Sequence, residues 1–122
     1  MDECHITKGE GRTRISLSAQ SFGDGLVVSI YNENRHIGAV AVGEYDQTEG
    51  RASTSVITRL GHKDDAIAQK AAYLISQRTK MPTCVIVGVH LDDITDGEIQ
   101  QFLVNADSLV ADFLKGLRKN HT

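Results

Sequence analysis

The chain has 122 residues and a net charge of −3, with 40% hydrophobic residues, one Pro and no Trp. This is the length of one domain, which can bury a core without metal or disulfide crosslinks. The negative charge and the lack of a basic stripe argue against nucleic-acid binding. No apolar run in the sequence approaches membrane-spanning length.

The ends of the chain and its cysteines indicate the compartment. The start, M-D-E-C-H, lacks the basic and apolar segments of a signal peptide. Cys4 and Cys84 predict free thiols in a reducing environment rather than a disulfide framework. We therefore expect one cytoplasmic domain over residues 1–122 with no membrane partner. The polar segment 1–11 and the basic tail 116–122 are expected to be loose.

The first half of the chain predicts four strands. Residues 12–21 alternate between apolar and polar side chains, which is typical of a half-buried strand. Short turns separate this strand from the apolar runs 26–31 and 36–43, so the three are expected to form an antiparallel meander. The charged segment 45–51 predicts a mobile loop. Residues 52–60 predict the fourth strand.

The second half alternates helix and strand. Residues 65–77 carry a stripe of aliphatic and small side chains suited to packing on a sheet. Residues 83–90 are the most apolar run and predict an interior strand. Thr95 and Glu98 form a capping box before a last helix, whose apolar stripe extends to Leu117 and packs on the core or partly on a second subunit. The order β-β-β-β-α-β-α predicts an α+β domain with helices packed on a mainly antiparallel sheet.

The junction between the fourth strand and the first helix has two interpretations. The first N–H groups of a helix lack partners within it and lie at the positive end of its dipole. Gly61, His62 and Lys63 could therefore bind a phosphate or carboxylate. Alternatively, Gly61 only permits a turn, and the acidic residues after it complement the dipole. The phosphate loop G-x-x-x-x-G-K-[ST] and the dinucleotide fingerprint G-x-G-x-x-G are both absent from the sequence.

Three of the five histidines lie at predicted element boundaries: His36, His62 and His90. At one edge of a sheet they could converge on a metal ion or serve proton transfer, although no pair has the spacing of a metal motif. Each could equally be a hydrogen-bonded or surface residue. Asp92 and Asp93 either complete a binding site at this edge or bond their own backbone in a turn. No nucleophile elbow or other catalytic pattern is present in the sequence.

Three blocks of sequence, taken together, carry a family resemblance. The blocks are H-I-G-A-V-A at 36–41, S-V-I-T with G-H-K-D-D within 55–65, and V-G-V-H-L-D-D-I-T at 87–95. This set resembles the LpdD-like family, small accessory proteins found beside prenylated-flavin-dependent decarboxylases of hydroxyarylic acids such as gallate. The resemblance covers roughly residues 12–115. Arg35 stands where Pro is expected, and Arg59-Leu60 stands where Leu-Pro is expected.

The resemblance implies a fold similar to proteasome-assembly chaperones, usually as a homodimer. It implies a chaperone, not an enzyme, that binds reduced prenylated flavin mononucleotide and helps load the large subunit of a partner decarboxylase. The flavin phosphate would bind at the helix start, and the three histidines would form a polar rim around the ligand, with or without a metal ion. The cofactor-binding residues implied are Gly61, His62, Lys63, His36, His90, Asp92, Asp93 and Ser55.

Two other functions stay open at this point. One is a subunit of the decarboxylase complex that binds no flavin and acts by contact alone. The other is a small enzyme that uses a metal ion on His36, His62 and His90. The aromatic content of 5% argues against an independent flavin enzyme, because aromatic side chains often stack on flavin rings. A carrier that must release its ligand needs less affinity than such an enzyme.

Overall fold

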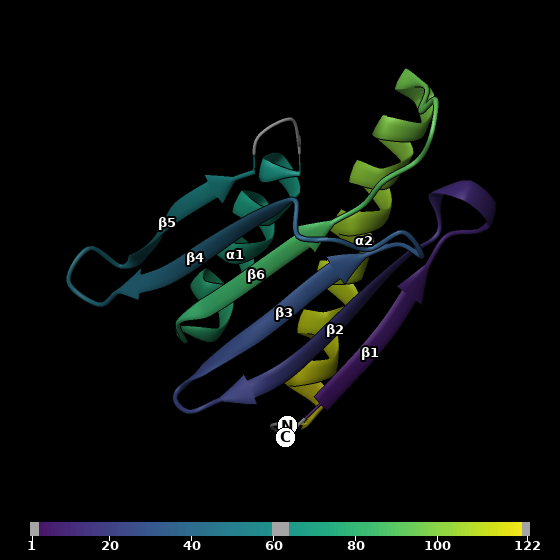
Figure 1. Ribbon diagram of the computed structural model, residues 1–122. Coiled ribbons are helices and arrows are strands. Elements are labelled where there is room, and N and C mark those ends of the chain that lie inside the picture. Colours follow the sequence, from purple (N-terminus) through teal and green to yellow (C-terminus); the bar gives the residue numbers. More distant parts are fainter. Residues whose placement is uncertain (1–2, 60–63, 121–122) are drawn as a thin grey trace.

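The computed structural model of the protein describes residues 3–59 and 64–120, with side chains as far as Leu117. These residues form a six-stranded sheet with two helices on one face (Figure 1). The elements in chain order are β1 (Glu3–Lys8), the short 3-10 helix η1 (Gly11–Thr13), β2 (Ile15–Phe22), β3 (Gly25–Tyr31), β4 (Ala39–Asp46), β5 (Arg51–Thr58), α1 (Asp65–Thr79), β6 (Thr83–Gly88) and α2 (Asp96–Asn120). The predicted α+β class and the mainly antiparallel sheet are confirmed.

The strands lie in the order β1-β2-β3-β6-β4-β5. β6 pairs parallel with β3 and antiparallel with β4, and every other pair is antiparallel. The predicted meander is therefore wrong beyond β3, because β6 lies between β3 and β4. The interior position predicted for residues 83–90 is confirmed, and it explains the insertion: a strand with apolar side chains on both faces is favoured at the centre of a sheet.

Several predictions about the ends of elements are wrong. Residues 36–38, predicted to begin a strand, lie in the loop before β4, and the predicted strand 12–21 begins only at Ile15, after η1. The amino terminus is ordered from residue 3, since β1 pairs antiparallel with β2 and turns Cys4 and Ile6 toward the core. Only residues 47–50 connect β4 to β5, because the two strands pair as far as Asp46 and Arg51. The tail 116–122 is helical as far as Asn120. Pairing with a neighbouring strand and packing on the core stabilise these segments despite their polar sequences.

Both helices lie behind the sheet in Figure 1. α1 packs on β4, β5 and β6, and α2 packs on β1 and β2. The core lies between the helices and this covered face of the sheet. Its fully buried aliphatic and aromatic side chains include Ile15, Leu17, Val28, Ile30, Ile75, Val85, Val87, Leu109 and Phe113. None of the helices described here is long and apolar enough to cross a membrane.

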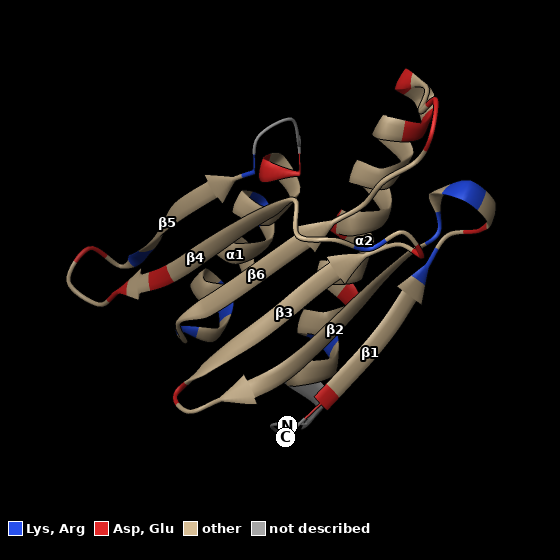
Figure 2. Ribbon diagram, viewed as in Figure 1, with Lys and Arg blue, Asp and Glu red and all other residues tan. Residues whose placement is uncertain are grey.

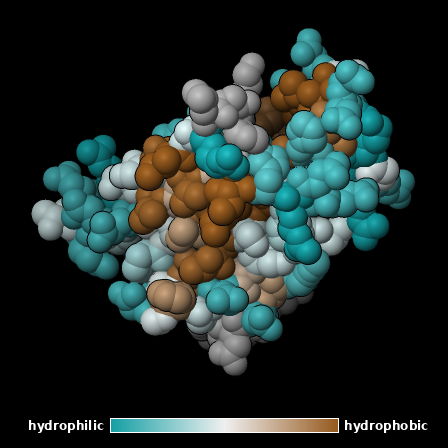
Figure 3. Space-filling model, in the orientation of Figure 1, coloured by the Kyte–Doolittle hydropathy of each residue, from teal (hydrophilic) through white to brown (hydrophobic). Residues whose placement is uncertain are grey.

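The other face of the sheet, the open face, is not covered by any described helix. Its side chains over β2 are largely polar, with Ser16 and Ser18 alternating with core residues, and β3 adds Ser29 between Val27 and Tyr31. Over β3, β6, β4 and β5 the open face is apolar, and Figure 3 shows this as a continuous brown area. We call this area the apolar stripe, and its members are Val27, Val40, Val42, Ile57, Cys84 and Ile86.

Candidate functional site

The candidate site lies where β3 and β6 end. The two strands are parallel, with Tyr31 opposite Gly88, so their carboxyl ends meet at one edge of the sheet. The loop 32–38 follows β3 and the loop 89–95 follows β6. Asp64, the residue just before α1, lies against the first of these loops. We call the group His36, Asp64, His90 and Asp92 the sheet rim.

Asn32 joins the two loops. Its side chain is buried, donates a hydrogen bond to the carbonyl oxygen of His90 (2.8 Å) and accepts one from the His90 amide (3.2 Å). The Asn34 side chain donates a longer bond to the same carbonyl (3.4 Å). A side-chain amide thus continues the backbone pairing of β3 with β6 past the end of both strands. Asn32 therefore fixes the position of His90.

The two histidines of the sheet rim meet edge to face. The ring centroids of His36 and His90 are 6.2 Å apart, with an angle of 80° between the ring planes. The predicted convergence of these two histidines is therefore present in the structure. Their exposures differ, because the His90 side chain is 56% exposed and the His36 side chain only 22%. One ring is thus held within the rim while the other faces solvent.

Each histidine of the sheet rim has a carboxylate beside it. The Nε2 atom of His90 lies 3.1 Å from an oxygen of Asp92, and that of His36 lies 3.7 Å from an oxygen of Asp64. The Nδ1 atom of His36 lies 3.2 Å from the carbonyl oxygen of Asn34 and donates to it in the tautomer that carries a proton there. Asp92 and the Asn34 carbonyl, which lie within hydrogen-bonding distance, orient the rings of His90 and His36, whereas Asp64 lies at ion-pair distance from His36.

Two glycines allow this close packing. A Cβ atom on Gly88 would lie 1.6 Å from the carbonyl oxygen of His36, and one on Gly38 would lie 1.9 Å from a carboxylate oxygen of Asp64. The Gly38 amide also donates to the Val87 carbonyl at 2.9 Å. A larger residue at Gly88 would displace the backbone of His36, and one at Gly38 would displace the Asp64 carboxylate. The V-G-V-H and H-I-G sequences thus have a steric role at the rim.

An ion pair anchors the second loop. The Arg12 guanidinium, on η1, donates to Glu98 (2.7 Å) and to the backbone carbonyl of Asp92 (2.8 Å). The hydrogen bond from Arg12, followed by the one from the Thr95 amide, lowers the pKa of Glu98 to about 2. Thr95 and Glu98 exchange the two bonds of the predicted capping box. Arg12 therefore ties the loop that presents Asp92 to the start of α2.

The remaining predicted site residues lie in different places. Asp93 is exposed and takes a left-handed backbone conformation (φ 53°), so it forms the turn while its neighbour Asp92 contacts a histidine. Ser55 lies within β5 opposite Val42, and it borders the apolar stripe rather than the sheet rim. Gly61, His62 and Lys63 lie outside the described residues. Their predicted roles stay predictions.

The predicted metal site on His36, His62 and His90 is likewise incomplete in the described part of the chain. Among the residues that the structure describes, no group of three His, Cys, Asp or Glu side chains is arranged to hold a metal ion. His36 and His90 face each other at the distance given above, and the third predicted ligand falls in the segment 60–63. The described residues therefore provide a histidine pair with two carboxylates.

Two hollows adjoin the sheet rim on the open face. The first, which we call the apolar hollow, has a volume of about 260 Å³. It is lined by Ser29, Ile30, Tyr31, Arg35, His36, Ile37, Ile86 and Gly88. The second, which we call the arginine hollow, has a volume of about 1000 Å³. It is lined by His5, Thr7, Gly11, Arg12, Arg14, Ser16, Tyr31, Asn32, Glu33, Asn34, Arg35 and Leu91.

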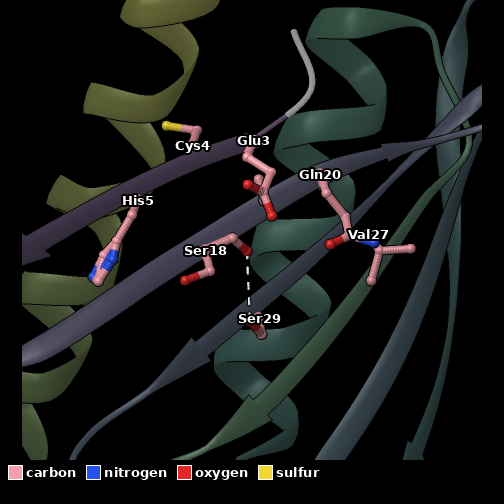
Figure 4. A pocket seen from close by; sticks show the side chains of 8 residues that line it. Glu3, Cys4, His5, Ser18, Gln20, Val27 and Ser29 are labelled. Carbon is pink, nitrogen blue, oxygen red and sulfur yellow. Dashed lines mark hydrogen bonds between the residues drawn. The ribbon is translucent and has the colours of Figure 1, made fainter.

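A third hollow, of about 390 Å³, lies over β1 to β3 away from the sheet rim. Figure 4 shows Glu3, Ser18 and Gln20 beside it, with Cys4 turned toward the helix side, where it packs on the core. The dashed line marks the bond from the Ser29 hydroxyl to the Ser18 carbonyl (3.5 Å). None of the predicted site residues lines this hollow.

A comparison with family models decides where the chain belongs. The model of the prenylated flavin chaperone LpdD-like domain matches residues 9–118. The chain belongs to this family. The family resemblance seen in the three sequence blocks is thereby confirmed. A comparison with curated proteins gives no significant match.

The LpdD-like chain also has a structural neighbour. It is similar to a protein in the crystal structure of a chaperone complex for yeast 20S proteasome assembly. The TM-score is 0.62 with 17% sequence identity, and the match covers 98% of both chains. At this identity the likeness establishes the fold, and the predicted similarity to proteasome-assembly chaperones is confirmed.

Four residues of this LpdD-like site were not predicted: Asn32, Asp64, Tyr31 and Arg35. Asp64 lies in the G-H-K-D-D block, two residues after His62, and its place in this block was a signal for it. Asn32 is the first polar residue after an apolar strand, where a turn residue is the ordinary interpretation. Tyr31 and Arg35 become part of the site only through the pairing of β3 with β6.

Proposed function

We propose that this LpdD-like protein binds reduced prenylated flavin mononucleotide at the sheet rim and delivers it to a prenylated-flavin-dependent decarboxylase. The observation that carries the proposal is the apolar hollow, which has a histidine in its wall and opens beside a polar hollow. A flavin combines a flat ring, a polar ring edge and a phosphate chain. A site for it needs adjoining apolar and polar surfaces of this kind.

The residues of the apolar hollow fit the ring. Ile86 and the 53% exposed Ile37 offer aliphatic surface, and Tyr31 offers an aromatic ring. His36 in the wall, with His90 next to it, can hydrogen-bond the nitrogen and oxygen atoms at the edge of the isoalloxazine. Asp92 and the Asn34 carbonyl lie within hydrogen-bonding distance of the two imidazoles, and Asp64 adds a negative charge beside His36. Asp93 remains a predicted contact of the ring edge.

The shape of the site suits a carrier. The cofactor acts in the decarboxylase rather than in the chaperone, so the chaperone has to hold the ring and then release it. A shallow hollow leaves one side of the ligand exposed to a partner, and it limits the buried area and therefore the affinity. This favours a chaperone over an enzyme as the role of the chain. A metal ion on His36, His62 and His90 stays a prediction, as do phosphate contacts from Gly61, His62 and Lys63 and a contact from Ser55.

We also propose that two copies pair through the part of the apolar stripe on β4 and β5, away from Ile86 and the apolar hollow. Ile57 is 75% exposed and Val42 is 47% exposed on a face without a covering element among the described residues. Apolar surface of this extent is typical of an interface. The stripe contains no charged side chain, so a two-fold axis through it would bring no like charges together.

Anaerobic titration tests the binding step. The purified protein, with His36→Ala and His90→Ala variants, is titrated with reduced prenylated flavin mononucleotide and, separately, with plain reduced flavin mononucleotide. The proposal predicts that the wild-type protein prefers the prenylated form and that each histidine variant binds it at least about tenfold more weakly, the equivalent of about 1.4 kcal/mol. Thr48→Ala, in the turn between β4 and β5, is the control and should bind normally.

A second assay tests delivery. The loaded chaperone is mixed with a decarboxylase that lacks its cofactor, and decarboxylation is followed over time. Activation should be faster than with the same concentration of free cofactor. A wild-type protein that binds neither flavin, but associates tightly with the large subunit, would contradict the proposal and favour a subunit that acts by contact alone.

A further inference from the structure

The arginine hollow differs from the other hollows in its charge. Three arginines and one glutamate, Glu33, are its charged residues. Figure 2 shows basic residues gathered around η1 and the adjoining strand ends, whereas the chain as a whole has a net charge of −3. A local excess of positive charge on an acidic protein indicates an anionic ligand or partner.

The three arginines are not equivalent. Arg12 is engaged by Glu98 and by the carbonyl of Asp92, as described above. Within the described part of the chain, no carboxylate forms an ion pair with Arg14 or Arg35. These two guanidinium groups therefore retain donors for an added anion. The hydroxyls of Thr7 and Ser16, which share a hydrogen bond of 3.1 Å, lie in the wall of the same hollow.

The arginine hollow shares a wall with the apolar hollow. Tyr31 and Arg35 line both. The Arg35 guanidinium stacks over the Tyr31 ring, 5.0 Å from its centroid, and the Tyr31 hydroxyl is hydrogen-bonded to Ser18 (2.7 Å). The stacking holds the guanidinium by its face and leaves its N–H edge available to bind. A ligand with an apolar ring in one hollow would extend past this pair into the other.

We propose that the arginine hollow binds the phosphate of the flavin, with Arg14 and Arg35 as the cationic residues. The inference rests on the proposed function, since it assigns the phosphate end of the same ligand. A phosphate monoester carries between about −1.5 and −2 charges at neutral pH. Arginine binds such a group through two parallel N–H bonds. This assignment differs from the predicted one at Gly61, His62 and Lys63, and experiment can separate the two.

The test compares the ligand with and without its phosphate. Reduced prenylated flavin mononucleotide, and the same compound after phosphatase treatment, are titrated anaerobically into wild-type protein and into the double variant Arg14→Gln/Arg35→Gln. Both arginines are exposed, so the double variant should fold, and thermal melting checks this. Arg51→Gln, in which an exposed arginine at the start of β5 is replaced, is the matched control. Lys63→Ala tests the alternative phosphate position.

The deciding result is the ratio of the affinity for the phosphorylated ligand to the affinity for the dephosphorylated ligand. We expect wild-type protein and Arg51→Gln to bind the phosphorylated form at least about tenfold more tightly, and the double arginine variant to bind both forms with the affinity of the dephosphorylated one. A double variant that retains the wild-type ratio would overturn the inference and leave the proposed function intact. Loss of the ratio in Lys63→Ala alone would assign the phosphate to the start of α1. Failure of both forms to bind wild-type protein would overturn the proposed function and this inference together.

Discussion

The two faces of the sheet use the same strands for opposite purposes. On the covered face, Ile30 is fully buried under the helices, and on the open face Ile57, the same residue type, is 75% exposed. Alternation along each strand sends successive side chains to opposite faces, so a single strand contributes both to stability and to a surface. In this protein the covered face contains the core, and the open face with its rim carries the residues to which we assign the ligand and the second copy.

The largest expected effect comes from making the same Ile→Ala substitution once on the covered face and once on the open face. Ile30→Ala should lower the free energy of unfolding by about 2–5 kcal/mol, because it removes buried methyl groups and leaves a cavity. Ile57→Ala should change it by no more than about 0.5 kcal/mol at protein concentrations that keep the chain monomeric. Urea unfolding followed by circular dichroism measures both. An equal loss of unfolding free energy in Ile30→Ala and Ile57→Ala would show that the open face is covered in the monomer.

Asn32, beside the sheet rim, sharpens the comparison between the two faces. It is buried like a core residue, although it is polar and contacts His90 of the rim. Asn32→Ala should lower the free energy of unfolding by about 1–3 kcal/mol, since the His90 amide loses its partner and the His90 carbonyl keeps only the longer bond from Asn34. The same variant should bind the flavin more weakly, because His90 is no longer held at the rim. Asn34→Ala, which removes only the longer bond, is the comparison. If Asn32→Ala binds normally while being destabilised, Asn32 serves the fold alone.

The apolar stripe predicts an effect on association rather than on folding. Val42→Lys places a charge in the middle of the stripe, so two copies could pair only by burying two ammonium groups. We expect this variant to be monomeric by light scattering, with a thermal midpoint close to that of the wild type. Thr48→Lys adds the same charge in the turn after β4 and should leave the dimer intact. Dimers of Val42→Lys would move the interface away from the open face.

The smallest effect concerns the ion pair between Arg12 and Glu98. The pKa of Glu98 is lowered to about 2 from 4.5, so its charge stabilises the folded state fully above about pH 4.5. That contribution is lost as the pH falls toward 2. Glu98→Gln keeps a capping side chain but no charge. Wild-type protein should therefore be more stable than this variant at pH 7, and the difference should shrink between pH 4.5 and pH 2. A difference that does not vary with pH would exclude the ion pair as its cause.

Local patterns predicted most of the elements correctly, and the errors have a common origin. The helix after Asp64, the capping box at Thr95 and the interior strand ending at Gly88 each follow from neighbouring residues. The pairing of β6 between β3 and β4 depends on contacts distant in sequence, and no pattern within β4 reveals it. The β1 strand is too polar to predict alone, because it is stabilised by β2 and by burial of alternate residues.

The site was predictable to the extent that its residues lie near the ends of elements: His36 and His90, predicted within strands 36–43 and 83–90, lie in the loops just outside β4 and β6. His36 and His90 were expected at one edge of the sheet, and their rings meet there. Asn32 and Arg35 were not expected, because their roles arise from the loop after β3 lying against the loop after β6. The arginine hollow likewise could not be predicted, because it is lined by residues of both η1 and β3. Their arrangement is a property of the fold rather than of any one segment.

The most direct test of the central claim is to locate the ligand on the protein. Amide chemical shifts of ¹⁵N-labelled protein would be followed anaerobically as reduced prenylated flavin mononucleotide is added. The account predicts that the largest shifts fall in residues 31–38 and 86–92, around the apolar hollow and the sheet rim, with smaller ones near Arg14. Shifts confined to the opposite end of the sheet, in the turns that join β2 to β3 and β4 to β5, would contradict it.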